Sequence, residues 1–106
     1  MHRTKIFAAA LTVALLLPAF QPAYALENPA KGKALAGQWC SSCHLVALDQ
    51  TSANADAPPF MTIARRSDKE FERLASFLID PHPKMPNFNL SRQQITDILG
   101  YIRTLR

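Results

Sequence analysis

The chain has 106 residues, a formal net charge of +4 and two cysteines. A chain of this length forms one small domain, and two cysteines allow one disulfide at most, which excludes a disulfide-stapled scaffold. Apolar residues make up 48% of the sequence and charged residues 19%, which excludes a disordered tail and a chain buried wholly in a membrane.

The N-terminus has the layout of a secretory signal peptide. A short positive segment at residues 2–5 precedes an apolar run at residues 6–17. Pro18 ends the run, and Ala23 and Ala25 are small residues at the two positions that a signal peptidase reads. An uncleaved membrane anchor is the alternative, but this run is shorter than the ~20 apolar residues that span a bilayer.

Cleavage after Ala25 divides the chain into a signal peptide, residues 1–25, and a mature domain, residues 26–106. The mature domain keeps ten basic and eight acidic residues, a net charge of +2. This weak charge, without a basic stripe, removes the main support for a nucleic-acid partner. Export predicts an oxidising location, the periplasm, with no membrane span after cleavage.

The first helix is predicted to begin at Pro29, because Asn28 is a favourable N-cap and proline costs no hydrogen bond at the first helical position. Apolar side chains follow at the spacing of one helical face: Gly32, Leu35, Ala36 and Trp39. Residues 45–59 show no long period and end in two prolines, which predicts a loop.

Two further helices are predicted from capping-box patterns. The first pattern is Ser67 with Glu70, and Asp80 ends that helix; its apolar face is Phe71, Leu74, Ala75 and Leu78. The second pattern is Ser91 with Gln94; its apolar face is Ile95, Ile98, Leu99 and Ile102. No stretch alternates with a period of two, so we expect an all-α fold. Three helices in so short a chain form a marginal core, which needs a staple, that is, an added stabilising element such as a metal ion, disulfides or a cofactor.

The segment Cys40-Ser41-Ser42-Cys43-His44 is the attachment signature of haem c. Thiols three residues apart on a helical turn project from nearby faces, so they can reach the two vinyl groups on one edge of a haem. His44 follows directly and can turn its imidazole toward the iron. The sequence therefore predicts one covalent haem c, which completes the core.

Three other interpretations of this segment compete. A thioredoxin-like redox pair fits Cys40 and Cys43 after Trp39, but it requires a βαβ pattern that this chain lacks. A zinc site has three clustered ligands here and no second pair at zinc spacing. A structural disulfide leaves His44 unexplained.

The second axial ligand of the iron is expected from a distant segment, and Met61, His82 and Met85 are the candidates. Met85 is favoured because prolines on both sides stiffen its loop. His82 is the next choice and gives a site of lower potential. Met61 lies in an apolar stretch, where core filling is the ordinary role of a methionine.

Over residues 29–105 the chain resembles small bacterial class I c-type cytochromes with one haem. Cys40, Cys43 and His44 match the attachment motif, and Met85 followed by proline matches the methionine loop of that family. The resemblance implies a small all-α cytochrome c fold, with helices and loops wrapped around one covalent haem.

The resemblance also implies two contacts. The N- and C-terminal helices cross where Gly32 meets Tyr101, and the carbonyl of Pro58 accepts a hydrogen bond from the proximal His44. Ala36 stands where the family commonly has an aromatic residue, and Trp39 is expected to supply the missing bulk.

Ligation by His44 and Met85 leaves no open iron site for a substrate, so an electron-transfer protein is expected rather than an enzyme. The expected partners are redox proteins: a periplasmic dehydrogenase or reductase, and a membrane oxidase or bc1-type complex. The carrier is expected to be a monomer. The alternatives are a dedicated cytochrome subunit bound stably to a periplasmic dehydrogenase, and a haem sensor or peroxidase with a labile Met85. Arg65-Arg66 is interpreted as a surface pair, with contact to the haem carboxylates as the alternative.

Overall fold

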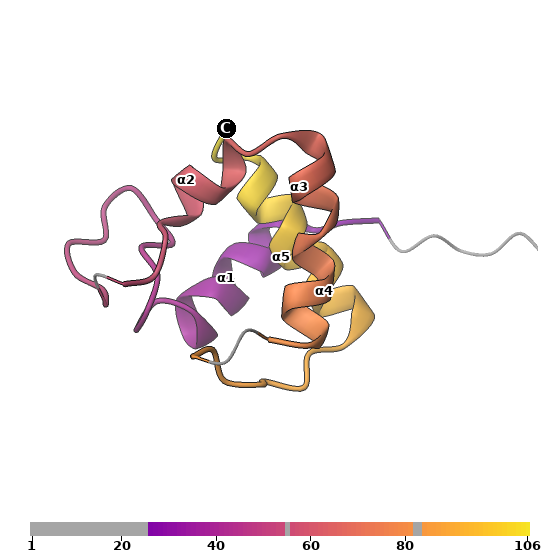
Figure 1. Ribbon diagram of the computed structural model, residues 1–106, viewed down its shortest axis with the longest axis horizontal. Coiled ribbons are helices and arrows are strands. Elements are labelled where there is room, and N and C mark those ends of the chain that lie inside the picture. Colours follow the sequence, from indigo (N-terminus) through magenta and orange to yellow (C-terminus); the bar gives the residue numbers. More distant parts are fainter. Residues whose placement is uncertain (1–25, 55, 82–83) are drawn as a thin grey trace, which may run out of the picture.

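A computed structural model describes residues 26–54, 56–81 and 84–106, and these ranges contain helices and no strand (Figure 1). The helices are α1 (Pro29–Trp39), α2 (Phe60–Ala64), α3 (Asp68–Glu72), α4 (Leu74–Ile79) and α5 (Arg92–Arg103). The predicted all-α fold is confirmed. The predicted signal peptide lies outside the described residues. Within them, no helix has the length and apolarity to cross a membrane.

The start of α1 is tied to α5 by a buried carboxylate. The side chain of Asn28 caps α1 by accepting a hydrogen bond from the Lys31 N–H (3.0 Å). The N–H of Asn28 in turn donates to Asp97 of α5 (2.8 Å), which is only 2% exposed. Gln93 donates to the same oxygen (2.8 Å), so the buried charge is hydrogen-bonded rather than isolated.

The two terminal helices, α1 and α5, form the most extensive helix pair of the fold and cross near the middle of the molecule (Figure 1). Gly32 makes this close approach possible. A Cβ at this position would overlap the backbone carbonyl of Asp97 and lie 2.9 Å from the Cβ of Tyr101. The expected crossing of Gly32 and Tyr101 is therefore confirmed, with the backbone of α5 as the tighter constraint.

The apolar faces predicted for the terminal helices form much of the core. The buried members are Gly32 and Ala36 in α1 and Ile95, Ile98 and Ile102 in α5. Trp39 is 39% exposed at the end of α1 and lies outside this core. It therefore does not join the core beside Ala36, contrary to expectation, and its ring packs instead against Phe88, with 5.4 Å between the ring centroids.

Tyr101 connects α5 to the loop that follows the cysteine motif. Its buried hydroxyl donates to the carbonyl oxygen of Val46 (2.5 Å). Burial, with a smaller contribution from the negative charge of Asp49, raises the pKa of Tyr101. The folded state therefore resists ionisation of this phenol.

In the Tyr101→Phe variant we expect the free energy of unfolding to fall by about 1–3 kcal/mol, because the buried carbonyl of Val46 loses this donor. Since folding raises the tyrosine pKa, its stabilising contribution is complete below about pH 10, the unfolded value, and is lost as pH rises through the folded pKa. The variant should lack this alkaline loss. Thermal unfolding of both proteins between pH 7 and 11 tests this, and parallel alkaline losses would contradict it.

The second predicted helix is in fact two short helices, α3 and α4. Its capping box is present, since Ser67 accepts from the N–H of Glu70 and the Glu70 carboxylate accepts from the N–H of Ser67. At Arg73 the backbone N–H is shared between the carbonyls of Glu70 and Phe71. This tightened turn interrupts the regular α-helix, which periodicity alone does not reveal.

Helix α2 was not predicted. It has no side-chain cap and contains the β-branched Thr62 and Ile63, which have modest helix propensity. Tertiary contacts hold it instead: the N–H of Phe60 donates to the carbonyl of Leu45 (2.9 Å), and Phe60 and Ile63 are buried. Packing therefore decided the conformation of this segment.

Candidate functional site

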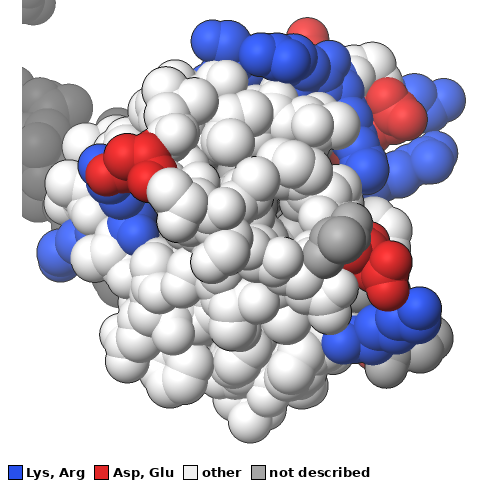
Figure 2. Space-filling view, turned by 90° about the vertical axis from the view of Figure 1, so that its left-hand side faces the viewer, with Lys and Arg blue, Asp and Glu red and all other residues white. Residues whose placement is uncertain are grey.

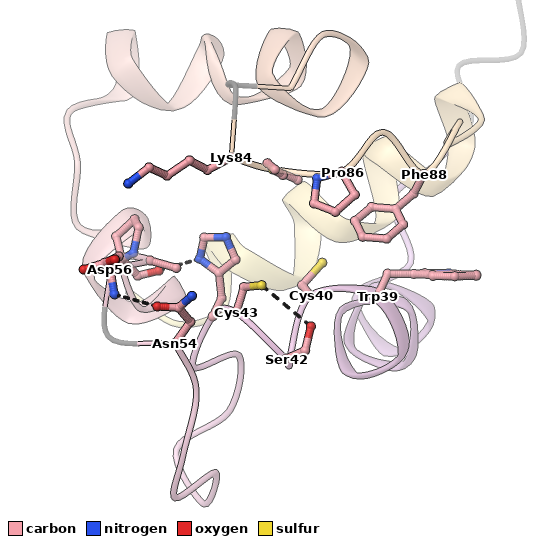
Figure 3. A pocket seen from close by; sticks show the side chains of 13 residues that line it. Trp39, Cys40, Ser42, Cys43, Asn54, Asp56, Lys84, Pro86 and Phe88 are labelled. Carbon is pink, nitrogen blue, oxygen red and sulfur yellow. Dashed lines mark hydrogen bonds between the residues drawn. The ribbon is translucent and has the colours of Figure 1, made fainter.

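The cysteine motif continues α1 as a tight turn. The N–H of Cys40 donates to the last turn of the helix, and the N–H groups of Cys43 (3.1 Å) and His44 (2.8 Å) both donate to the carbonyl of Cys40. Neither cysteine is in a disulfide. Figure 3 shows both thiol groups on the side of the turn that faces Lys84 and Pro86. The turn thus presents two unpaired thiols to one cavity.

The imidazole of His44 is held by the loop that follows. His44 is 8% exposed, and its Nδ1 lies 2.7 Å from the carbonyl oxygen of Pro58, the contact implied by the family resemblance. An Nδ1 that donates to a carbonyl leaves the Nε2 lone pair free to bind a metal ion. The ring of Phe60 packs against the imidazole at 5.4 Å between centroids. The side chain therefore has a fixed tautomer and a fixed plane.

Gln50 organises the backbone around the motif, a role that the sequence did not indicate. Its side-chain amide donates to the carbonyls of Ser41 (2.8 Å) and His44 (3.0 Å) and accepts from the N–H of Val46 (2.8 Å). One polar side chain in an aperiodic loop carries no signal of such a role. Only the folded loop reveals that Gln50 bridges the turn on both sides of the histidine.

The cavity has two adjoining parts that share four lining residues: Cys40, His44, Pro58 and Met85. The part that we call outer also contains Cys43 and Lys84, and Figure 3 shows its lining side chains; we call the other part inner, and both are partly open to solvent. The other lining residues of the inner part are Phe60, Ile63, Arg66, Leu74, Phe77, Leu78, Leu99 and Ile102. Apart from Arg66, these additional walls are apolar, contributed by α2, α4 and α5.

The three candidates for the distal ligand have different locations. Met85 is half-buried and lines both parts of the cavity, together with His44. Met61 packs partly buried against the hydrophobic core and is not among the described lining residues. His82 lies outside the described residues. Of the two described candidates, Met85 is the one that the fold brings to the histidine.

The competing interpretations of the motif find little support in this geometry. Burial, with a smaller contribution from Cys43, raises the pKa of the Cys40 thiol to about 11, whereas a thioredoxin-like pair needs a lowered thiol pKa. No three or more His, Cys, Asp or Glu side chains of the described ranges are grouped to hold a metal ion, so a zinc site is not formed there.

The lining residues fit a haem group. Two free thiols stand beside an imidazole with one available nitrogen, a thioether lines the same cavity, and an apolar inner part suits the macrocycle. An arginine at the inner part suits the carboxylates of the haem.

Comparisons with known proteins agree with this fit. The family model for cytochrome c matches residues 29–106. The chain is 56% identical over 75 residues to "Cytochrome c-552" of Bradyrhizobium diazoefficiens, a match that covers 71% of this chain and 72% of that protein. The search of solved structures gave no significant match.

Proposed function

Because this chain belongs to the cytochrome c family, whose members carry a covalently attached haem c and transfer electrons, we propose that it is a one-electron carrier with the iron bound by His44 and Met85. The observation that supports this ligation most directly is that both side chains line both parts of one cavity. The thiols of Cys40 and Cys43 would add across the two vinyl groups of the haem and so form the two thioether bonds. The protein is not an enzyme.

Haem iron with both axial positions filled exchanges one electron between Fe(II) and Fe(III) and offers no open site to a substrate. The protein's own residues set the conditions of that exchange. The carbonyl of Pro58 orients the imidazole of His44, and Gln50 fixes the turn that carries it. The apolar walls of the inner part lower the polarity around the haem and would favour the less charged, reduced state. A methionine ligand raises the potential further.

Absorption spectra of the purified holoprotein in both redox states, followed by a redox titration, test this function. We expect a haem that survives denaturation, a weak sulfur–iron absorption at the red edge of the oxidised spectrum, and a single one-electron transition. Binding of carbon monoxide by the resting reduced protein would contradict the proposal and favour a sensor or peroxidase with a labile Met85.

We also propose that Arg66 binds the haem carboxylates. Arg66 lines the same part of the cavity as His44 and Met85, so a haem held between those two side chains would lie beside its guanidinium. A guanidinium is well suited to a carboxylate. Only Arg65 then keeps the interpretation of an ordinary surface residue.

Arg66→Gln is expected to lower the midpoint potential, because a nearby positive charge disfavours the oxidised haem. A charge at roughly 10 Å contributes about 1 kcal/mol, or ~40 mV for one electron. The potential should also become more dependent on pH near neutrality, because the carboxylate pKa rises. Arg65→Gln removes the same charge outside the cavity lining and is the control. Equal shifts in both variants would contradict a direct contact.

The partners that we propose are redox proteins bound transiently: a periplasmic dehydrogenase or reductase, and a membrane oxidase or bc1-type complex. Figure 2 shows a face with a hollowed centre free of coloured Lys, Arg, Asp and Glu atoms, with Lys and Arg side chains along its upper margin and Asp and Glu side chains at its left and right margins. Such a face suits a small interface with weak charge steering. We expect a monomer in gel filtration. Copurification with one enzyme in fixed ratio would favour a dedicated subunit instead.

We propose that the protein is exported to the periplasm and that residues 1–25 are removed as a signal peptide. The positive segment, the apolar run and the small residues before Leu26 support this. N-terminal sequencing of protein from the periplasmic fraction should begin at Leu26. Detection of peptides from residues 6–17 in the mature protein would indicate a retained anchor.

A further inference from the structure

The segment that carries Met85 has weak attachment to the motif side of the fold. Among its described residues, 84–90, the hydrogen bond formed is local: the N–H of Asn89 donates to the side chain of Asn87 (2.8 Å). No hydrogen bond joins these residues to α1 or to the Cys40–His44 turn. Pro86, next to the methionine, has no N–H to donate. Backbone and side-chain hydrogen bonds therefore do not hold this segment against α1 or the Cys40–His44 turn.

An aromatic contact joins this segment to the end of α1. The rings of Trp39 and Phe88 lie 5.4 Å apart between centroids, tilted by 42°, which is a favourable aromatic geometry. Figure 3 shows the pair at one end of the cavity, with Asn54 and Asp56 at the other end. Both rings line the outer part of the cavity, as Met85 does.

The two partners of this pair differ in how firmly the fold holds them. Trp39 is the last residue of α1, which is fixed by its close crossing with α5 at Gly32. Phe88 lies in an irregular segment between Asn87 and Asn89, where the N–H of Asn89 donates to the side chain of Asn87. Asn89 has a φ of 52°, in the left-handed region that asparagine tolerates better than most residues, and Leu90 then packs against the core.

We propose that the Trp39–Phe88 aromatic pair positions Met85, so that its thioether stays on the haem iron. This inference depends on the proposed ligation by Met85. The aromatic neighbour of the His44 imidazole is Phe60, not this pair, and the pair acts by holding the methionine segment against the end of α1. Trp39 is partly exposed and lies outside the core. The proposal gives this residue a role at the rim of the cavity.

The test is the displacement of the methionine by imidazole in the oxidised holoprotein. The loss of the sulfur–iron absorption measures this displacement. Trp39→Leu and Phe88→Leu should each raise the apparent affinity for imidazole by about 2- to 12-fold, the range expected for one aromatic contact. The apparent imidazole affinity of the double variant should be close to that of the stronger single variant, because both substitutions remove the same interaction. Trp39→Phe keeps an aromatic ring, so its imidazole affinity should remain close to that of the unsubstituted protein.

Two controls separate positioning from general destabilisation. Leu48→Ala changes an 84% exposed apolar residue outside the cavity lining and should leave imidazole affinity unchanged. In a Met85→Ala background no thioether competes, so Trp39→Leu should not change imidazole affinity there; binding in this background is measured by the shift of the Soret band, because the sulfur–iron absorption is absent. Three results would contradict a positioning role for the pair. The single variants could bind imidazole as the unsubstituted protein does, or their effects on affinity could multiply in the double variant. The effect of Trp39→Leu could also persist in the Met85→Ala background. Absence of the sulfur–iron absorption in the unsubstituted protein overturns the ligation itself, and this inference with it.

Discussion

Cys40→Ala combined with Cys43→Ala is expected to yield a chain that carries no covalent haem and is largely unfolded. The apolar inner part of the cavity, formed by side chains of α2, α4 and α5, would have no macrocycle to pack against. A domain of this size has only ~5–15 kcal/mol of stability, and small domains depend on a staple for much of it. We therefore expect loss of most of the helical circular dichroism signal together with the haem.

The measurement is haem staining after denaturing electrophoresis, with circular dichroism of the same samples. Ser42→Ala is the matched control, because it changes an exposed residue between the two cysteines and removes neither attachment point. The control should keep both haem and helix. A double cysteine variant that stays folded and stable would disprove the dependence of the fold on the attached group.

Met85→Ala is expected to abolish the sulfur–iron absorption and to lower the midpoint potential by on the order of 100 mV, because the methionine ligand favours the reduced iron. The iron should then bind carbon monoxide or imidazole, since one axial position is open. Spectra of both redox states and a redox titration measure these changes. The protein should remain folded, because both thioether bonds are kept.

Met61→Ala is the control for this substitution. Met61 packs partly buried against the core, so its truncation should cost about 1–3 kcal/mol of stability and leave the spectrum unchanged. If Met85→Ala leaves the spectrum unaltered, the distal role passes to Met61 or His82. A spectrum lost only in Met61→Ala would assign the ligand to that residue.

Much of the fold was predictable because its signals are local. Asn28 before Pro29, and the capping boxes that begin at Ser67 and Ser91, mark helix starts that the structure contains. Local signals failed where packing decided the outcome. Helix α2 is held by a hydrogen bond to Leu45, and the predicted second helix is interrupted at Arg73.

The candidate site divides in the same way. The spacing of Cys40, Cys43 and His44 is local, since covalent attachment to one haem edge constrains three neighbouring residues. The contributions of Gln50 and Arg66 are not local, because they depend on which loop folds beside which turn. No sequence pattern distinguished Arg66, which lines the cavity, from the adjacent Arg65.

The sequence by itself determined that this chain is helical, that it is small enough to need a staple, and that its two cysteines and their histidine are suited to a haem. These properties follow from periodicity, capping and the reach of neighbouring side chains, all of which act within a few residues. The tertiary structure alone decided that Asp97 is buried beneath the start of α1 and that Trp39 meets Phe88 at the rim of the cavity. Such contacts join residues far apart in the chain, so they exist only once the chain has folded and α1 and α5 have crossed at Gly32.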